Sequence, residues 1–299
     1  MNEIIVGLDE SEGAAEALRW AVREGDLRGR PVRAVLVWDY LDQHRLDGPN
    51  AFDPTYDESL AEKVLAEAVT HAVGPAPAEA IARTTVCDRA ANGLIDQAAD
   101  AELLVVGARG LGGFKSLLLG SVSNQCLHHA PCPVAVVHTP VVPASGPERI
   151  VVGIDGSATA QSALRWALAE ARARRARLDV VHAWPVPVVG GPFTIMAFDP
   201  VVSERTAHGI VDDAVAAEDA AGVDLHRVVI CGSAAPALLS TADGASLVVV
   251  GSRGRGGFQR LLLGSVSQQV AQHVRCPVVV VPPSIRRPGG VGQQLEGDG

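Results

Sequence analysis

Short apolar runs alternate with amphipathic stretches along the first 140 residues. The apolar runs are nearly continuous and rich in β-branched residues at 4–8, 32–38, 83–87, 103–106 and 134–137, which is typical of strands buried on both faces of a parallel sheet. Apolar positions at helical spacing predict helices at 14–22, 60–73, 93–99 and 121–129. Ser11 precedes the first of them as a candidate N-cap. This order predicts an α/β fold with a parallel sheet and helices on both of its faces.

The whole pattern then occurs a second time. The segment from Ile4 recurs from Ile150 at an offset of 146, and the 17 residues from Gly107 recur from Gly251 at an offset of 144 with 13 identical positions. A unit of this length is a duplicated domain, because solenoid repeats span about 20 to 50 residues. We predict a first domain over 1–139, a proline-rich linker over 140–148, a second domain over 149–283 and a disordered tail over 284–299.

Composition and charge narrow the class of protein. Hydrophobic residues make up 47% and charged residues 20% of the chain, as in ordinary globular proteins. The net charge of −9 lies in residues 1–140, which hold 11 basic and 20 acidic residues, so nucleic acid is not expected as a partner. No apolar run is long enough for a membrane span. The five cysteines form no CxxC pair, so we expect no disulfide framework, no metal site and a cytoplasmic location.

A glycine-rich loop follows the fourth predicted strand of each half. In the first half, Gly107 and Gly110 precede a helix that begins near Gly120 and Ser121. Ligands of open parallel sheets bind at the carboxyl ends of the strands, and free N–H groups at the start of a helix favour a phosphate group. A surface loop without a ligand is the alternative that the residues leave open.

Asp9 and Asp155 follow the first predicted strand of each half. A carboxylate at that place either binds ribose, adenine or a phosphate-bound metal ion, or stabilises the next helix through its negative charge. The residues alone leave both roles open.

Cationic side chains near the loops are few. Arg109 and Arg253 lie within the loops and are candidates for binding phosphate oxygens. For Arg255, whose counterpart is Leu111, a solvated position is expected. The chain holds only two lysines, Lys63 and Lys115, and neither half has the lysine of a phosphate-binding P-loop, which argues against rapid hydrolysis.

The remaining candidate residues are assigned to packing. Core or structural positions are expected for His129, His182, His273, Cys132, Cys276, Trp20, Trp38, Trp166 and Trp184. Cys126 has no cysteine counterpart, and a redox role for it has no support. Residues 40–59 and 185–203 differ between the halves, so we expect the two sites to differ in closure or affinity.

The spacing of the loop glycines identifies a resemblance. The pattern G-x2-G-x9-G-[S/T] occurs at 107–121 and again at 251–265, and it resembles the ATP-binding signature of the universal stress protein family. The opening Ile-Val-Gly-Leu-Asp-Glu-Ser, the Leu-Leu-Gly-Ser-Val-Ser block and the closing Cys-Pro-Val strand also agree in order and spacing. The likeness covers nearly the whole chain apart from linker and tail.

The resemblance implies the fold and the site. Each domain would hold an open five-stranded parallel sheet of order 3-2-1-4-5, adenine nucleotide alpha hydrolase-like, with ATP across the carboxyl ends of its first and fourth strands. The implied contacts of the first domain are Gly7, Leu8, Asp9 and Val37 for adenine and ribose, with Val106, Gly107, Gly110, Gly120, Ser121, Val122 and Ser123 for ribose and phosphates. Those of the second domain are Gly153, Ile154, Asp155, Ala183, Val250, Gly251, Gly254, Gly264, Ser265, Val266 and Ser267. Edge-to-edge pairing of 134–137 with 278–281 is implied as well.

These observations predict an ATP-binding regulator of the stress response with two nucleotides per chain, little or no hydrolysis and no catalytic residue. An accompanying Mg²⁺ is left open, and a homodimer and an unidentified protein partner are expected. One alternative is a slow ATPase or phosphotransfer enzyme, in which Asp9 or Asp155 would orient water through Mg²⁺. The other is a nucleotide-independent dimerisation or chaperone-like module.

Overall fold

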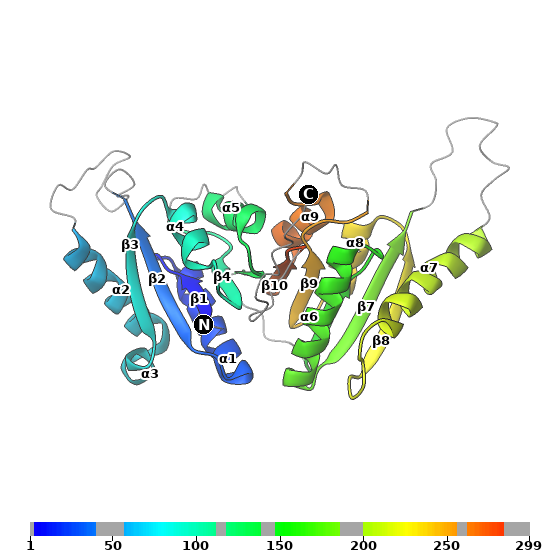
Figure 1. Ribbon diagram of the computed structural model, residues 1–299, viewed down its shortest axis with the longest axis horizontal. Coiled ribbons are helices and arrows are strands. Elements are labelled where there is room, and N and C mark those ends of the chain that lie inside the picture. The colour runs from blue at the N-terminus through cyan, green and yellow to red at the C-terminus, as the bar shows by residue number, and fades with distance from the viewer. Residues whose placement is uncertain are drawn as a thin grey trace, which may run out of the picture.

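A computed structural model describes residues 3–39, 57–111, 118–138, 147–185, 200–255 and 262–283. Its strands span Ile4–Gly7 (β1), Val32–Trp38 (β2), Ala82–Cys87 (β3), Leu103–Gly107 (β4), Val134–Val137 (β5), Arg149–Gly153 (β6), Arg177–Trp184 (β7), Leu225–Cys231 (β8), Leu247–Gly251 (β9) and Val278–Val281 (β10). They form one continuous sheet in the order β3-β2-β1-β4-β5-β10-β9-β6-β7-β8 (Figure 1). The five strands predicted for the first half are confirmed to within one residue at each end.

Each half has the strand order 3-2-1-4-5, with all neighbouring strands parallel. The halves meet where β5 and β10 pair antiparallel, with Val134 opposite Val280 and Val136 opposite Val278. This confirms the predicted pairing of the last strands, and it joins two five-stranded sheets into one. The pairing covers two edges that would otherwise expose unpaired backbone groups, so a homodimer, which stays a prediction, would have to use another surface.

The helices cover both faces of the sheet, as predicted. They span Glu12–Arg28 (α1), Glu58–Val73 (α2), Pro75–Glu79 (α3), Ala90–Gln97 (α4), Ser121–His129 (α5), Ala158–Arg174 (α6), Pro200–Ala216 (α7), Ala234–Thr241 (α8) and Ser265–His273 (α9). Buried side chains of α1, α2, α6 and α7 belong to one core cluster, and those of α4, α5, α8 and α9 belong to the other. Each core therefore runs across both halves. The five-residue α3 was not predicted, because it is too short to display a helical period.

Serine residues cap the first helix of each half. The Ser11 hydroxyl accepts a hydrogen bond from the Ala14 N–H at 3.1 Å, and the Ser157 hydroxyl accepts one from the Ala160 N–H at 3.2 Å. The predicted Ser11 cap is confirmed. Because a capped helix start has a defined geometry, these bonds also fix the turns that follow β1 and β6.

Four charged side chains of α1 and α6 form a buried ion-pair cluster between the halves, which we call the junction quartet. Arg28 binds Glu170 at 2.5 Å and Glu24 at 3.3 Å, while Arg174 binds Glu170 at 2.5 Å and also contacts Glu24. The side chains of the two glutamates are each 1% exposed. The Arg28 guanidinium also lies 4.6 Å from the ring centroid of Trp166, a favourable cation–π contact.

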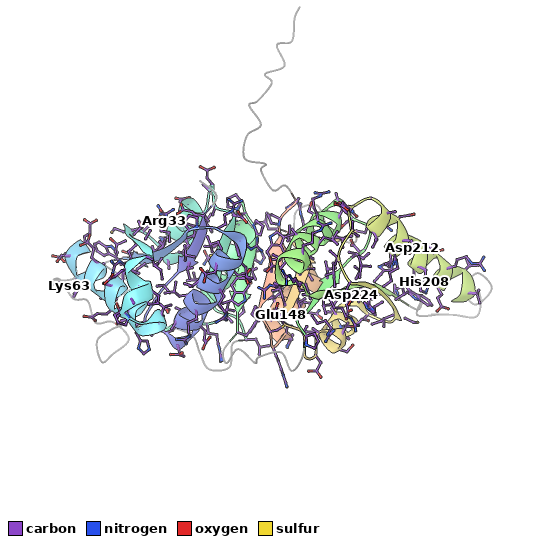
Figure 2. All side chains as sticks on the ribbon, turned by 90° about the horizontal axis from the view of Figure 1, so that it is seen from below. Arg33, Lys63, Glu148, His208, Asp212 and Asp224 are labelled. Carbon is purple, nitrogen blue, oxygen red and sulfur yellow. The ribbon has the colours of Figure 1, made fainter. Side chains whose placement is uncertain are left out.

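Burial makes every charge of the junction quartet depend on its partners. Desolvation raises the pKa of Glu170 against the opposing attraction of Arg28, and it lowers the pKa of Arg174 to about 10. Glu148, which lies where the halves meet (Figure 2), adds a further contact of 3.3 Å to Arg174. Loss of one member would therefore leave a buried charge without its partner.

The division of the chain at 1–139, 140–148, 149–283 and 284–299 stays a prediction. Most of the linker and all of the tail lie outside the described residues. Within the described ranges, no helix combines the length and the apolarity that crossing a membrane requires.

Candidate functional site

Asp9 ties the loop after β1 to the glycine-rich loop after β4. Its Oδ1 accepts hydrogen bonds from the backbone N–H of Ser11 at 2.9 Å and from the Ser11 hydroxyl, and its Oδ2 accepts one from the Leu111 N–H at 3.1 Å. A Cβ at Gly110 would overlap the same Oδ2, so glycine is needed for this close approach. Asp9 thus connects the two loops, a role that the sequence did not indicate.

Asp155 does the same in the second half. Its Oδ1 accepts a hydrogen bond from the Ser157 N–H at 2.9 Å, and its Oδ2 accepts one from the Arg255 N–H at 2.7 Å. A Cβ at Gly254 would overlap Oδ2. Both aspartates are half-buried, and both carboxylate oxygens of each are occupied by donors from the chain itself.

Gly107 and Gly251 are explained by packing within the chain. A Cβ at Gly107 would lie 2.7 Å from the carbonyl carbon of Gly13, and a Cβ at Gly251 would lie 2.9 Å from that of Thr159. Real Cβ contacts are longer than this, so the first signature glycine lets the end of β4 or β9 lie against the start of α1 or α6. These glycines need no ligand to account for them.

Gly120 and Gly264 are the N-cap residues of α5 and α9 and have no such explanation. The atom of the described residues closest to a Cβ at Gly120 is the Ala108 oxygen at 3.4 Å, and at Gly264 it is the Ser252 oxygen at 3.4 Å. Both distances are ordinary van der Waals contact. A glycine cap offers no side-chain acceptor, and the first N–H groups of a helix have no partner within the helix. Each helix start, at residues 120–123 and 264–267, is therefore an anion-binding arrangement, which we call a cradle.

The serines of each cradle divide into two kinds. The Ser123 hydroxyl is buried and donates to the Gly107 oxygen at 2.7 Å, and the Ser267 hydroxyl donates to the Gly251 oxygen at 2.6 Å. These two hydrogen bonds connect α5 to β4 and α9 to β9. Ser121 and Ser265 are exposed, so their hydroxyl groups are accessible to a ligand. Val122 and Val266 are half-buried and belong to the cradles through their backbone N–H groups.

The residues expected near adenine and ribose do not all present side chains to one place. Leu8 is buried in the core beneath α1 and α2, whereas Val37 and Val106 pack in the core on the opposite face of the sheet. Gly7 lies under Leu94, whose Cδ1 would be 2.7 Å from a Cβ there. The second half repeats this with Gly153 under Leu238, buried Ile154 and Val250, and half-buried Ala183.

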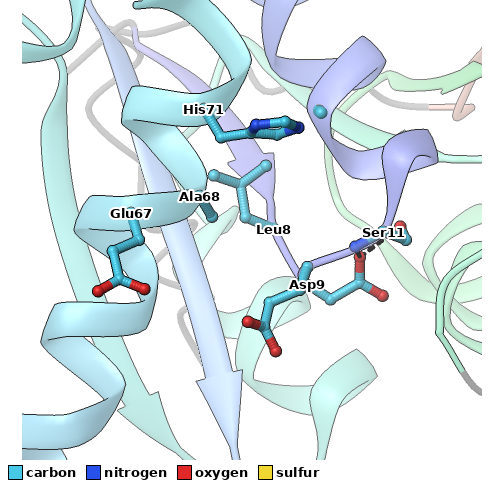
Figure 3. A pocket seen from close by; sticks show the side chains of 8 residues that line it. Leu8, Asp9, Ser11, Glu67, Ala68 and His71 are labelled. Atoms are coloured by element: carbon cyan, nitrogen blue, oxygen red, sulfur yellow. Dashed lines mark hydrogen bonds between the residues drawn. The ribbon is translucent and has the colours of Figure 1, made fainter. Parts of the chain in front are cut away.

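A cavity of about 190 Å³ lies beside Asp9, on the side of α2 (Figure 3). It is lined by Leu8, Asp9, Glu10, Ser11, Ala15, Glu67, Ala68 and His71. Only Leu8 and Asp9 belong to the site that the resemblance implies. The loop residues 112–117 and 256–261 lie outside the described residues, so the walls of the cradles are described in part.

Basic residues near the cradles are arginines. Arg109 and Arg255 are exposed, and Arg253 is half-buried. Lys63 lies on α2 at the outer end of the first half (Figure 2), and Lys115 falls outside the described residues. Phosphate binding at the described parts of the cradles would thus use backbone N–H groups, hydroxyls and guanidinium groups.

Some of the described histidine and cysteine residues take buried structural positions, but His129 and His273, for which structural positions were expected, are exposed. His182 is buried with its Nδ1 2.9 Å from the Ile154 oxygen. Cys126, Cys132 and Cys276 are buried, and burial raises the pKa of each thiol to about 12. The expected packing roles of His182, Cys132 and Cys276 are confirmed. Among the described residues, no three His, Cys, Asp or Glu side chains form a group suited to a metal ion.

His138 is a buried group that the sequence analysis missed. It follows β5, its Nε2 is buried without a hydrogen-bond partner among the described residues, and its imidazole contacts the backbone of Ala271 on α9. Burial lowers the pKa of His138 to about 4, helped by the nearby positive charge of Arg109. A neutral imidazole thus connects the end of β5 to a helix of the second half, and its counterpart Pro282 gave no signal for it.

Comparison with known proteins agrees with this geometry. The chain is 35% identical over 295 residues to a universal stress protein of Mycobacterium tuberculosis strain H37Rv, covering 94% of this chain and 97% of that one. It is 34% identical to a universal stress protein of Mycolicibacterium smegmatis over the same shares. The crystal structure of a universal stress protein from Archaeoglobus fulgidus matches 94% of this chain and 96% of its own with a TM-score of 0.66 at 23% identity, which supports the fold. The family model of the universal stress protein family matches residues 1–138 and 147–282, and the chain is a tandem member of that family.

Proposed function

We propose that this protein binds ATP at two sites, one in each half, and regulates a stress response through occupancy of those sites with little or no hydrolysis. The phosphates would lie on the cradles at Gly120–Ser123 and Gly264–Ser267. Adenine and ribose would lie toward the ends of β1 and β2 in the first half and of β6 and β7 in the second. An accompanying Mg²⁺ would bind the phosphates.

The observation that carries the proposal is the pair of helix starts, at α5 and α9, that have a glycine cap in an extended conformation that any residue adopts. The glycine cap of α3, Gly74, differs because its φ of +84° favours glycine. α1, α2 and α6 are each capped by a side chain that accepts an N–H bond, from Ser11, Asp57 and Ser157. At α5 and α9 a glycine stands at the cap although its surroundings would admit a Cβ. Relative to glycine, serine, aspartate or asparagine at that position would stabilise the helix by roughly a few tenths of a kcal/mol. Glycine keeps the N–H groups open to an external anion instead.

The surroundings of Asp9 and Asp155 support the proposed low hydrolysis. Activation of water by a carboxylate needs a lone pair directed at the water or at a metal ion that holds it. Each oxygen of the two aspartates already accepts a hydrogen bond from the chain, so part of the lone-pair capacity of each carboxylate is used by the loops. Their proposed role is to hold the loops that carry the cradle.

The test is isothermal titration of the full chain with ATP, compared with Gly120→Asp, Gly264→Asp and the double variant. An N-cap aspartate places its own carboxylate on the N–H groups that a phosphate would use, and it stabilises the helix at the same time. We expect a stoichiometry near two for the wild type, one for each single variant and none for the double variant. Gly120→Ala and Gly264→Ala are the matched controls, because they add a Cβ without an acceptor and should retain binding. A wild-type chain that binds no ATP would refute the proposal.

A further inference from the structure

The cavity of Figure 3 lies between α1 and α2, and its lining includes Ala15 and Ala68. At an offset of 146, the second half has Gln161 on α6 and Ala214 on α7. The Gln161 Nε2 donates hydrogen bonds to the Ala214 oxygen at 2.9 Å and to the Glu218 carboxylate at 2.9 Å. An amide group therefore connects the helices of the second half at the place where the first half has an alanine and a cavity.

A second pair of contacts shows that the two helix pairs correspond along their length. Arg19 of α1 donates to the Ala72 oxygen at 3.3 Å, and their counterparts Arg165 and Glu218 form an ion pair of 2.8 Å. The Ala68 oxygen is thus the counterpart of the carbonyl acceptor that the amide uses in the second half. A carbonyl oxygen has two lone pairs, so a helical carbonyl can accept a second hydrogen bond. An N–H donor from a ligand can therefore take the place that the amide occupies in the second half.

The surroundings of the cavity are more acidic than the corresponding region of the second half. Four glutamates correspond there to a single acidic residue, and Ala72 corresponds in turn to Glu218, so the first half carries two more negative charges. Arg19 is already paired with glutamates of its own helix. A cationic ligand is therefore attracted to this region of the first half. The four glutamates are Glu10, Glu12, Glu16 and Glu67, and their counterparts are Gly156, Ala158, Ser162 and Asp213.

Glu67 supplies a carboxylate that is available to a ligand in the cavity. It is exposed on α2, lines the cavity, and has no hydrogen bond or ion pair to another residue of the described ranges. The Asp9 oxygens, by contrast, already accept hydrogen bonds from the chain. Leu8, Ala15 and Ala68 add apolar surface. The volume of about 190 Å³ holds about six non-hydrogen atoms at roughly 30 Å³ each.

We propose that this cavity binds short aliphatic amines, with the ammonium group between the Glu67 carboxylate and the Ala68 oxygen and the alkyl chain against Leu8 and Ala15. An ammonium group has three donors and no acceptor, which suits a carboxylate and a carbonyl. No described residue of the first cradle or of the loop after β4 lines the cavity, so the amine site is separate from the phosphate site. The inference does not depend on the proposed nucleotide binding. It gives the first half a ligand whose donor the second half replaces with its own Gln161.

Titration calorimetry of the full chain with 1,4-diaminobutane tests the proposal. The titration is made without nucleotide, at low ionic strength and at pH 8, so that protonation of His71, which also lines the cavity, does not oppose the ammonium group. We expect one diamine per chain and no binding of 1,4-butanediol, which has the same length without the charge. Ala15→Gln copies the amide of the second half, and it should weaken diamine binding at least about tenfold without lowering the Tm of the ligand-free protein. A wild-type chain that does not bind the diamine, or a folded Ala15→Gln variant that binds it as tightly as the wild type, would overturn the proposal.

A second pair of variants separates the carboxylate of the cavity from the general acidity of the first half. Glu67→Gln should weaken diamine binding about tenfold, because a charge-assisted hydrogen bond is lost. Glu62→Gln removes the same charge from an exposed position of α2 that does not line the cavity, and binding should stay within about twofold of the wild type. Equal losses for the two variants would mean that the diamine only responds to net charge, and the inference would fail while the proposed function would stand.

Discussion

The two halves of the chain have the same ion-pairing residues at the junction and the same helix caps. They differ in the loops that follow the first and fourth strands of each half. At the junction quartet both halves supply a Glu and an Arg one helical turn apart, and each residue is used by the partner half. In the loops that follow β1 and β4, Glu10 and Leu111 of the first half correspond to Gly156 and Arg255 of the second half. The residues in common pair across the two halves or cap a helix. The residues that differ lie in the loops after the strands, where Arg255 contacts Gly156 and Glu10 lines the cavity beside Asp9. The duplicated chain therefore retains what holds the two halves together, while the loops around the proposed sites have diverged.

The largest effect is expected at the junction. Arg174→Met should lower the free energy of unfolding by about 3–5 kcal/mol, because Glu24 and Glu170 are buried and would lose a charged partner. Arg172→Met is the control, since Arg172 is on the same helix but pairs at the surface with Asp219, and about 1 kcal/mol or less is expected. Urea denaturation measures both. Equal losses for the two variants would show that the junction quartet is not the stabilising contact.

Replacing the whole quartet sharpens the same comparison. Hydrophobic residues at all four positions remove the desolvation cost together with the attraction, and such replacements are often neutral or stabilising. We expect the quadruple variant to be at least as stable as Arg174→Met and to keep the halves joined through β5 and β10. Urea denaturation of the quadruple variant beside Arg174→Met provides the measurement. A quadruple variant less stable than the single one would contradict this account.

A smaller difference in stability is expected between the two kinds of glycine in the G-x2-G-x9-G pattern, namely those that pack against a helix and those that cap one. Gly107→Ala should cost about 1–3 kcal/mol, because the new Cβ meets the backbone of Gly13 at 2.7 Å and neither strand nor helix can yield cheaply. Gly120→Ala should change the free energy of unfolding by less than half of that amount, since its nearest contact is ordinary at 3.4 Å. Thermal unfolding without nucleotide compares the two, and the reverse order would remove the packing explanation.

Ser123→Ala should lower stability by about 1 kcal/mol, because the Gly107 carbonyl loses a buried hydroxyl donor. ATP affinity at the first cradle should change less than about threefold. The twin Ser267→Ala should behave alike at the second cradle. A loss of affinity of tenfold or more without a loss of stability would instead place these hydroxyls on the phosphate.

The smallest effect concerns the thiols. Cys87 and Cys231 are exposed, while Cys126, Cys132 and Cys276 are buried with pKa values raised to about 12. Because burial raises the pKa of these thiols from 9.0 to about 12, they form about a thousandfold less thiolate at pH 8 than an exposed cysteine. Alkylation of the native protein followed by mass spectrometry should modify only Cys87 and Cys231. Rapid modification of Cys126 would reopen a redox role.

Much of the fold was predictable because its signals are local. Nearly continuous β-branched runs identified β1 to β5, and the repeat transferred them to β6 to β10. The junction quartet was not predicted, although Glu24 and Arg28 recur as Glu170 and Arg174 at the offset of 146. Helical spacing alone does not say whether such a pair faces solvent or a second helix.

The site was predictable as a place but not in its detail. Glycine spacing located the cradles at Gly120 and Gly264, yet it did not reveal that Gly107 and Gly251 are needed against α1 and α6. The bridge from Asp9 to the Leu111 N–H joins residues 102 positions apart. Contacts of that range depend on how two loops meet in space, which no local pattern encodes.

The most direct test of the account compares thermal unfolding of the wild type and the Gly120→Asp, Gly264→Asp double variant, each with and without ATP. Ligand bound to the native state alone stabilises it by about 2.7 kcal/mol at a hundred times Kd. We predict that ATP raises the Tm of the wild type and leaves that of the double variant unchanged, while the variant without ATP is no less stable than the wild type. An equal rise in Tm for both proteins would contradict the claim that the glycine-capped helix starts hold the nucleotide.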